Sequence, residues 1–440
     1  PTAGPPLPMG HRRTPDDSAM RGGVRERNRL ANEIAQEEHT MVVQWRILLA
    51  AVSALALVLA AATPVAGATR KVKPSPLRAG NLLRVKDIAA NGNTGKGQVV
   101  AVGWREASKP GRLYLAFSRD GGKDYRRTNG RLRKYPVVGD PRRGISLDIC
   151  AKRVWAATAY HRSSDRPGDS DVLLTSRTIG GGAAQALMTR TSEDRRVRGV
   201  TVSCVGNQYV AVGWLNKNGY GKTTARLMIR SLEPLGTPPS FKKVSNLGVA
   251  EFKSGLDVAA TPTSVAVAFV RNGHLRLKRF EVDRVTPGAI SGVPLKTIVW
   301  KDVKHPQMAA RSKRLVVAYT DRGKIRAKVS RNQGETLGRP ATLARTGGLR
   351  NPSKAHSIDL VGDRIVATAR VYSKATGYEP QRITSSDFGD TWSTRTFGNV
   401  GARVAALLKK QGRDPLLTEA WHNNAPKGSA DTIRARYELP

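Results

Sequence analysis

The chain of 440 residues has few residues of several types, and each shortage excludes a class of protein. Its two cysteines exclude a small domain held together by a disulfide framework. Aromatic residues make up 5% of the chain, and the seven histidines are scattered without metal-ligand spacing. We find no phosphate-binding loop, no dinucleotide fingerprint and no Gly-x-Ser-x-Gly motif. We therefore expect no metal and no cofactor.

Acidic residues are also few, 34 against 74 lysines and arginines, which gives a formal net charge of +40. Only seven of the basic residues lie within residues 1–68, so the excess belongs to the rest of the chain. A strongly basic surface favours anionic partners. The basic residues are not interleaved with aromatics as in a known nucleic-acid module. We therefore expect an acidic glycan or a cell-wall polyanion as the partner, and not nucleic acid.

Long apolar runs are absent except near the N-terminus, at residues 47–62. A charged start before this run and an Ala-x-Ala ending after it give residues 41–68 the layout of a secretory signal peptide. The run is shorter than the roughly 20 residues of a spanning helix, but a membrane anchor is the alternative if it is not cleaved. Residues 1–40 show no strand pattern and are expected to be a disordered extension, which a misplaced start codon would explain. We expect a secreted monomer in which 69–81 is a basic lead-in.

A short apolar strand motif recurs along the rest of the chain. Its first copy ends at Trp104 and reads Val-Val-Ala-Val-Gly-Trp, with a small residue before the aromatic one. Seven copies close at positions 104, 160, 214, 269, 319, 370 and 421, at intervals of 50 to 56 residues. Strands repeated at such a period are typical of a propeller. We predict an all-β, seven-bladed β-propeller of four-stranded antiparallel blades over residues 82–440, with six blades as the alternative.

The small residue before each aromatic has a physical interpretation. Sheets converge near the axis of a propeller, where only glycine or alanine lets neighbouring sheets approach, and the aromatic fills the wider gap outside. A first strand precedes each copy across a tight turn, as at 145–150 and 200–204. We assign the short apolar stretch 82–85 to the strand that closes the ring by completing the last blade.

A second motif follows the third strand of the first and sixth units. It reads Ser-Arg-Asp-Gly-Gly-Lys-Asp-Tyr from Ser118 and Ser-Ser-Asp-Phe-Gly-Asp-Thr-Trp from Ser385, with weaker copies from Ser176, Ser231 and Ser330. This pattern resembles the Asp-box, or bacterial neuraminidase repeat, of sialidase-like β-propellers. The resemblance implies a propeller fold and a structural role for the box residues. These residues are Ser118, Asp120, Gly122, Tyr125, Ser385, Asp387, Gly389 and Trp392.

The same resemblance leaves two functions open. Sialidases of this type use three arginines, a Tyr–Glu pair and an Asp, and their Phe/Tyr-Arg-x-Pro motif has no match here. The chain is therefore expected to be a recognition module for an acidic glycan, with an exo-acting glycoside hydrolase similar to exo-α-sialidases as the alternative. Whether it is an enzyme stays open. The catalytic candidates are Glu106, Tyr378 and Glu379, for which a solvated loop is the alternative interpretation.

Basic residues stand just before the first strand in one unit after another. If the blades superpose, these residues form a positive ring at one end of the axis, where arginine can bind carboxylate or phosphate in bidentate fashion. A merely basic surface is the alternative. The predicted anion-binding residues are Arg142, Arg143, Arg198, Lys253, Lys354 and Arg403, with Lys304 and His305 at the same point of the fifth unit.

The two cysteines, Cys150 and Cys204, lie 54 residues apart, which is one repeat. They fall on the first strands of the second and third units, which are expected to be adjacent inner strands. Export would favour their oxidation to a disulfide. Two small buried thiols are the alternative.

Overall fold

The structure is a computed structural model, and every regular element in its described part is a β-strand. It describes residues 75–80, 83–91, 98–106, 112–122, 125, 134–137, 145–160, 170–179, 185–189, 196–232, 245–282, 296–345, 354–373, 377–397, 403–410, 413–423 and 431–438. All of these lie in the unit Thr69–Pro440. The expected extension (1–40), signal peptide (41–68) and alternative anchor (47–62) lie outside the described residues. No helix in the described part is long and apolar enough to cross a bilayer.

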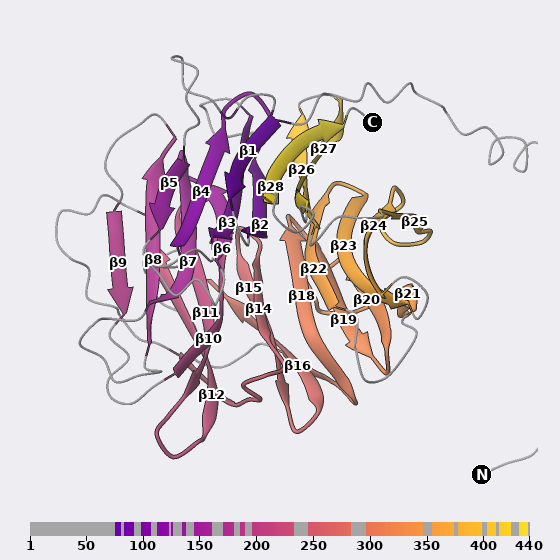
Figure 1. Cartoon of the computed structure of the whole chain (residues 1–440). Helices are drawn as coiled ribbons and strands as arrows, with labels where there is room; N and C mark the ends of the chain where they lie inside the picture. The colour runs from indigo at the N-terminus through magenta and orange to yellow at the C-terminus, as the bar shows by residue number, and fades with distance from the viewer. Residues whose placement is uncertain are drawn as a thin grey trace, which may run out of the picture. The chain divides into compact units, whose positions relative to one another are not determined.

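The strands form four-stranded antiparallel sheets, the blades of the propeller (Figure 1). Blade 1 contains β2 (Leu83–Asn91), β3 (Val99–Glu106), β4 (Arg112–Ser118) and β5 (Lys134–Val137). Blade 2 contains β6 (Ser146–Cys150), β7 (Arg153–Tyr160), β8 (Asp171–Thr178) and β9 (Gln185–Thr189). Blade 3 contains β10 (Arg196–Val205), β11 (Tyr209–Lys217), β12 (Thr223–Ser231) and β13 (Ser245–Val249). Blade 4 contains β14 (Leu256–Ala260), β15 (Ser264–Arg271), β16 (His274–Glu281) and β17 (Lys296–Trp300).

The remaining three blades repeat this plan. Blade 5 contains β18 (Val303–Arg311), β19 (Arg314–Asp321), β20 (Lys324–Ser330) and β21 (Ala341–Arg345). Blade 6 contains β22 (Lys354–Val361), β23 (Arg364–Ser373), β24 (Gly377–Ser385) and β25 (Ser393–Thr396). Blade 7 contains β26 (Arg403–Lys410), β27 (Arg413–Asn423), β28 (Asp431–Glu438) and β1 (Ser75–Gly80). The predicted all-β propeller with seven blades is confirmed.

Ring closure differs from the expectation in one strand. The strand that completes blade 7 is β1, which pairs with β28 as the outermost strand of that sheet. The assignment of residues 82–85 to this role is wrong, because β2 pairs with β3 as the inner strand of blade 1. Part of the expected lead-in, 69–81, thus belongs to the last blade. Because β1 joins the two ends of the propeller, only the closed ring satisfies its backbone groups.

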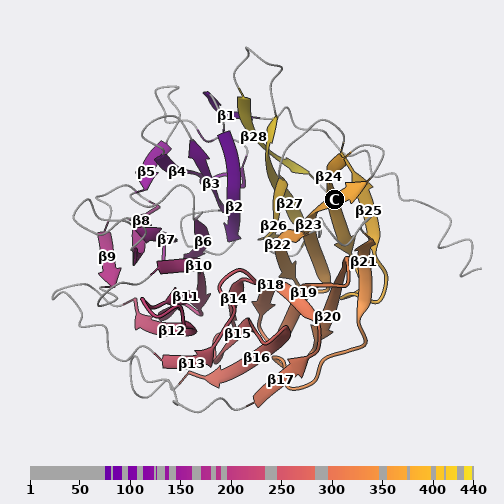
Figure 2. The ribbon, with the colours of Figure 1, turned by 60° about the horizontal axis from the view of Figure 1, so that its bottom comes forward.

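The first strand of each blade is the innermost one, and each contacts the first strands of the two neighbouring blades (Figure 2). The contacts run from β2 through β6, β10, β14, β18, β22 and β26 and return to β2. Apolar clusters fill the spaces between neighbouring sheets. The core of this protein is therefore a series of layers between blades.

Two glycines show why a small residue precedes the aromatic in the repeated strand. A Cβ added at Gly103 would lie 2.9 Å from Ile145 Cγ2 of the next blade, and one at Gly213 would lie 2.4 Å from Val258 Cγ2. Both distances are shorter than van der Waals contact allows. The aromatic that follows Gly103, Trp104, is fully buried. At these two positions, neighbouring blades thus approach too closely for a larger side chain.

The Asp-box segments from Ser118, Ser330 and Ser385 form the same turn. In each, the serine Oγ accepts the backbone N–H of the box glycine, at 3.0, 2.8 and 2.7 Å respectively. The box glycines Gly122, Gly334 and Gly389 have φ of +92°, +90° and +91°, a conformation that favours glycine. The other box residues lie in the same turns: Asp120 and Asp387 accept a hydrogen bond from the serine Oγ, Tyr125 is buried, and Trp392 Nε1 donates to Gly389 O at 2.9 Å.

Candidate functional site

A cavity of about 420 Å³ lies between the inner strands, along the axis of the ring. Its lining is polar, because alternate side chains of each inner strand point toward the axis. The charged residues that line it are Asp87, Asp148, Asp257, Asp359, Arg311 and Lys409. Four carboxylates thus face one cavity in a chain whose net charge is strongly positive.

Each of the four carboxylates bridges two blades. One carboxylate oxygen accepts the backbone N–H of the residue that follows it in the same strand. The other accepts a backbone N–H from the inner strand of the next blade. These second hydrogen bonds join Leu147 to Asp87 (2.7 Å), Cys204 to Asp148 (2.6 Å), Met308 to Asp257 (2.6 Å) and Leu407 to Asp359 (2.8 Å).

Serine hydroxyls make the same kind of bridge at other positions. Val202 N–H donates to Ser146 Oγ at 3.1 Å, and Ala260 N–H donates to Ser203 Oγ at 3.1 Å. On β6, Ser146 and Asp148 bind the N–H groups of two alternate residues of β10 in the same order, so these two inner strands run in the same direction. The starts of neighbouring inner strands therefore lie at the same end of the ring, which we call the mouth.

Burial dominates the acid–base behaviour of the four aspartates. It raises the pKa of Asp87 to about 7 and that of Asp257 to about 6, although backbone hydrogen bonds oppose the rise. Burial also raises the pKa of Asp148 and of Asp359, against the opposing charge of Arg311. The Arg311 guanidinium also reaches across the cavity and donates from Nη2 to the carbonyl of Ala90, at 3.1 Å.

With both oxygens bonded to backbone N–H groups, these carboxylates hold blades together. Sequence reasoning missed them, although the signal is present. Each is an aspartate followed by an aliphatic residue in a first strand, as at Asp148-Ile149. Within the described residues, no three or more His, Cys, Asp and Glu side chains are grouped so that they could hold a metal ion.

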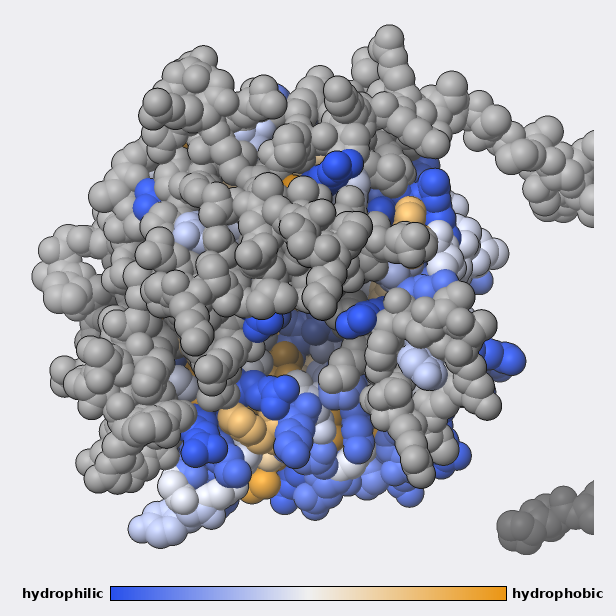
Figure 3. Space-filling view, in the orientation of Figure 1, coloured by the Kyte–Doolittle hydropathy of each residue, from blue (hydrophilic) through white to orange (hydrophobic). Residues whose placement is uncertain are grey.

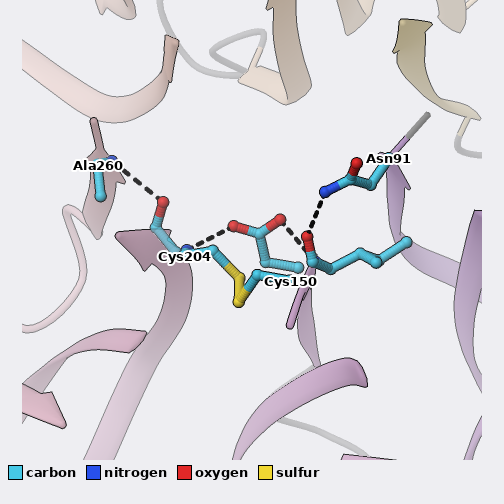
Figure 4. Close-up of a disulfide and its surroundings, with 7 residues drawn as sticks. Asn91, Cys150, Cys204 and Ala260 are labelled. Carbon is cyan, nitrogen blue, oxygen red and sulfur yellow. Dashed lines mark hydrogen bonds between the residues drawn. A yellow bond between two sulfur atoms is a disulfide. The ribbon is translucent and has the colours of Figure 1, made fainter. Parts of the chain in front are cut away.

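A disulfide joins Cys150 of β6 to Cys204 of β10, beside one of these bridges (Figure 4). Asn91 of blade 1 donates from Nδ2 to Ile149 O at 2.7 Å, on one side of the disulfide. The hydrogen bond from Ala260 of blade 4 lies on the other side. Inner strands of four successive blades are therefore linked around the cysteines.

At the mouth, four inner strands carry irregularities close to their starts. A β-bulge places extra residues in one strand and turns side chains away from the regular alternation. The register shifts lie between Val85 and Asp87, between Arg198 and Thr201, between Lys304 and Gln307, and between Ala355 and Ser357. The last three of these shifts lie at or beside positions where the sequence predicted basic residues, namely Arg198, Lys304 and Lys354.

The predicted anion-binding residues fall into three groups. Arg198, Lys253 and also Lys304 are exposed. Arg142 and Arg143 lie outside the described residues, as does the side chain of Lys354. Arg403 is 4% exposed.

Three of the predicted residues are exposed at the mouth, in blades 3 to 5. We call these residues, Arg198, Lys253 and Lys304, the basic rim. The Arg198 guanidinium lies 5.9 Å from the ring centre of Phe252, which precedes Lys253. The next residue, Ser254, accepts the N–H of His305 at 2.9 Å, beside Lys304. Within the described part of the chain, neither Arg198 nor Lys253 forms an ion pair.

The acidic residue Glu251 lies beside the rim. Burial tends to raise its pKa, but hydrogen bonds from Ser254 Oγ and Gly273 N–H lower it on balance. The positive charge of Lys304 acts in the same direction. Glu251 therefore stays ionised and holds the loop between β13 and β14, while Arg198 and Lys253 present their charges to solvent.

Arg403 lies in a different environment, between blades 6 and 7. Its Nη1 donates to Glu419 Oε2 at 2.7 Å, and Arg382 Nη1 donates to Glu419 Oε1 at 3.1 Å. Its guanidinium stacks 3.5 Å from the ring centre of Phe397 and 4.8 Å from that of Trp421. Glu419 is fully buried. In this position the Arg403 charge is balanced inside the protein.

The described side chains do not bring the three catalytic candidates together. On the hairpin of β23 and β24, Tyr378 is opposite Tyr372 and Glu379 is opposite Val371. Tyr378 and Glu379 are consecutive in a strand, where successive side chains point to opposite faces. The side chains of Tyr378 and Glu106 lie outside the described part.

The seven sheets around a polar axis define the chain as a seven-bladed β-propeller. No protein-family model matches the chain, and no curated protein sequence matches it. Among solved structures it is similar to Trypanosoma rangeli sialidase, at 13% identity and TM-score 0.38, over 71% of this chain and 57% of that protein. It is also similar to a prolyl endopeptidase, at 14% identity and TM-score 0.42, over 78% of this chain and 47% of that one.

A third similar structure is a protein of unknown function from Dyadobacter fermentans, at 11% identity and TM-score 0.44, over 85% of this chain and 100% of that one. The chain spans little more than half the length of the sialidase and about half that of the prolyl endopeptidase. At identities this low, the similarity concerns the fold and not the activity.

Proposed function

We propose that this propeller is a recognition module that binds an acidic glycan, or a comparable polyanion, at the basic rim. The observation that carries the proposal is the exposure of Arg198 and Lys253 at the mouth without ion-pair partners in the described part of the chain. Charges of one sign gathered at one end of a ring raise the local concentration of an oppositely charged ligand. Guanidinium groups can in addition bind carboxylate or sulfate groups in bidentate fashion.

The Asp-box turns from Ser118, Ser330 and Ser385 support placing this chain among sialidase-like propellers. Their shared hydrogen bonds stabilise tight turns, and the turns pack between blades: a Cβ at Gly389 would lie 2.9 Å from Val329 Cγ1 of blade 5. This is a structural contribution. The turns therefore support a sialidase-like scaffold without assigning an activity to it.

We further propose that the protein acts outside the cell. The disulfide between Cys150 and Cys204 supports this, because disulfides persist in oxidising compartments. Secretion after cleavage of residues 41–68 predicts a mature N-terminus near Thr69. N-terminal sequencing of the protein recovered from culture medium tests this proposal, and recovery only from the cell membrane contradicts it.

The binding proposal is tested with heparin and alginate, a sulfated and a carboxylated polysaccharide, by calorimetry at low and high salt. We expect Arg198→Ala/Lys253→Ala to lower affinity by about tenfold, since exposed ion pairs contribute up to about 1 kcal/mol each. The matched control is Lys152→Ala/Lys313→Ala. It removes the same charge from exposed residues in the β6–β7 and β18–β19 turns, at the other end of the inner strands.

Equal affinity of the two double variants would overturn the proposed rim, because net charge alone would then explain binding. The hydrolase alternative is examined in the same samples with 4-methylumbelliferyl sialoside. Release of the fluorophore at a rate that saturates with substrate, lost in Arg198→Ala/Lys253→Ala, would replace the recognition module with an exo-acting glycosidase.

A further inference from the structure

Blade 3 presents one aromatic side chain almost completely to solvent. Tyr220 is 98% exposed, at the tip of the hairpin between β11 and β12. The other exposed large apolar side chains of the described residues, Val249 and Val299, are less than half exposed. This hairpin extends beyond the neighbouring sheets at the bottom of Figure 1.

The tip that carries Tyr220 is a defined turn. Asn218 N–H donates to Lys222 O at 3.0 Å, and Gly221 N–H donates to Asn218 O at 3.0 Å. Lys222 N–H donates to Asn218 Oδ1 at 2.8 Å. Gly221 has φ of +81°, the conformation that closes a three-residue hairpin loop. These contacts fix the backbone on both sides of Tyr220, so little conformational entropy is lost when a ligand stacks on its ring.

The surroundings of Tyr220 are basic. Lys217 and Lys222 flank the turn, and Lys217 is opposite Arg196 in the strand pair. The Lys217 side chain lies along the tip, since its Cε is 3.9 Å from the position of a Cβ at Gly221. Hydrophilic side chains dominate the lower part of Figure 3, where the hairpins of blades 3 to 5 lie. An apolar ring face is thus combined with positive charge.

The hairpin that carries Tyr220 follows β11, and β11 pairs with β10, the strand that carries Arg198 of the basic rim. Arg198 is opposite Leu215 in the strand pair, five residues before Tyr220. At about 3.3 Å per strand residue, five residues span at most roughly 17 Å, which bounds the distance of the tip from the level of Arg198. A single sugar cannot reach both places, but a linear oligomer can.

We propose that Tyr220, with Lys217 and Lys222, forms an outer subsite for one ring of a linear anionic polysaccharide whose neighbouring segment lies on the basic rim. The proposal rests on the binding function proposed above and specifies its ligand. The face of a pyranose ring presents C–H groups that pack on an aromatic ring, and its carboxylate or sulfate pairs with the lysines. Single-stranded nucleic acid fits less well, because such sites stack successive bases on several aromatics.

The test compares wild type with Tyr220→Ala and Tyr220→Trp against long alginate and alginate disaccharide. We expect Tyr220→Ala to weaken binding of the long chain by about tenfold and Tyr220→Trp to retain it. The slope of log affinity against log salt should be unchanged in Tyr220→Ala, because no charge is removed. Lys217→Ala/Lys222→Ala should reduce that slope. The disaccharide should bind at least tenfold more weakly than the long chain.

The outcomes separate this proposal from the proposed function. If Tyr220→Ala binds long alginate as wild type does while Arg198→Ala/Lys253→Ala loses binding, the rim stands and the outer subsite is wrong. If neither variant changes the affinity, both are wrong. Tighter binding of poly(dT) than of alginate, with loss in Tyr220→Ala, would overturn the assignment to polysaccharide. Because Tyr220 is exposed, its variants should melt at the wild-type temperature.

Discussion

The backbone N–H of Cys204 donates to Asp148 Oδ2 at 2.6 Å, and this bond joins the inner strands of two blades. The same two strands are joined covalently by the disulfide between Cys150 and Cys204. At three other places around the ring, an aspartate makes the same bridge without a disulfide. The blades of this propeller are therefore linked near the axis by buried side-chain to backbone hydrogen bonds, in addition to apolar packing.

The bridging aspartates predict an unusual dependence of stability on pH. The folded pKa of Asp87, about 7, exceeds the value of about 3.9 expected in the unfolded chain. Its contribution to stability is therefore fully present below pH 4 and is lost as the pH rises toward 7, at up to about 1.4 kcal/mol per pH unit. For Asp257 the loss ends near pH 6. Urea unfolding of wild type and Asp87→Asn between pH 4 and 8 measures this.

The difference in unfolding free energy between wild type and Asp87→Asn should change across this window in favour of the variant as the pH rises. Asp390→Asn is the control, because it replaces an exposed aspartate and leaves the buried bridge at Asp87 intact. A difference that moves the other way would mean that the hydrogen bonds from Ile88 and Leu147 outweigh desolvation.

Loss of the disulfide should destabilise the propeller without unfolding it. We expect Cys150→Ser/Cys204→Ser to lower the free energy of unfolding by about 2–4 kcal/mol, because the cross-link no longer restricts the unfolded chain. The backbone N–H of Cys204 is unaffected, so the bridge to Asp148 is retained. Thermal melting with and without reductant checks this: reductant should lower the melting temperature of wild type to that of the variant, and leave the variant unchanged.

Adding even a methyl group at the position of Gly213 should lower the stability of the protein. A Cβ there would lie 2.4 Å from Val258 Cγ2 and 2.8 Å from Leu256 Cδ2, so Gly213→Ala should cost about 1–3 kcal/mol through overpacking. Gly338→Ala is the matched control, since its Cβ would lie 3.5 Å from the nearest atom. Chemical unfolding of both variants gives the comparison. Equal stability of the two would show that blades 3 and 4 can move apart at no cost.

Replacing Glu419 should lower the free energy of unfolding far more than replacing an exposed acidic residue. Glu419→Gln removes the buried carboxylate charge that pairs with the guanidinium groups of Arg403 and Arg382, which should cost about 3–5 kcal/mol. Glu335→Gln removes an exposed partner of Arg279 and should cost less than about 1 kcal/mol. Urea unfolding distinguishes the two. A small effect at Glu419 would indicate that water enters between blades 6 and 7.

Much of the fold could be predicted from the sequence, because a propeller repeats one local structure along the chain. Each blade is a meander of strands that are consecutive in the chain, so the strand motif ending at Trp104 and its six repetitions predicted the number of blades. The serine, glycine and aromatic positions of the Asp-box from Ser385 act within one turn. Their pattern is readable for the same reason.

The surroundings of individual polar side chains could not be predicted from the sequence in this way. Arg198 and Arg403 both stand near the start of a first strand, yet one is exposed and the other pairs with Glu419 beneath aromatic rings. The difference arises from side chains contributed by other strands and other blades. Sequence position alone does not encode these neighbours.

By itself, then, the sequence determined the repeat, the all-β class, the positive charge and the turn motifs, since these depend on contacts between residues close together in the chain. The tertiary structure decided which strand closes the ring, because β1 and β28 pair from opposite ends of the propeller. It also decided that the acidic residues face the axis, where Asp87, Asp148, Asp257 and Asp359 each accept an N–H from the next blade. The first feature requires the ring to close and the second requires neighbouring blades to pack, so both depend on groups that lie about one repeat or more apart in the sequence.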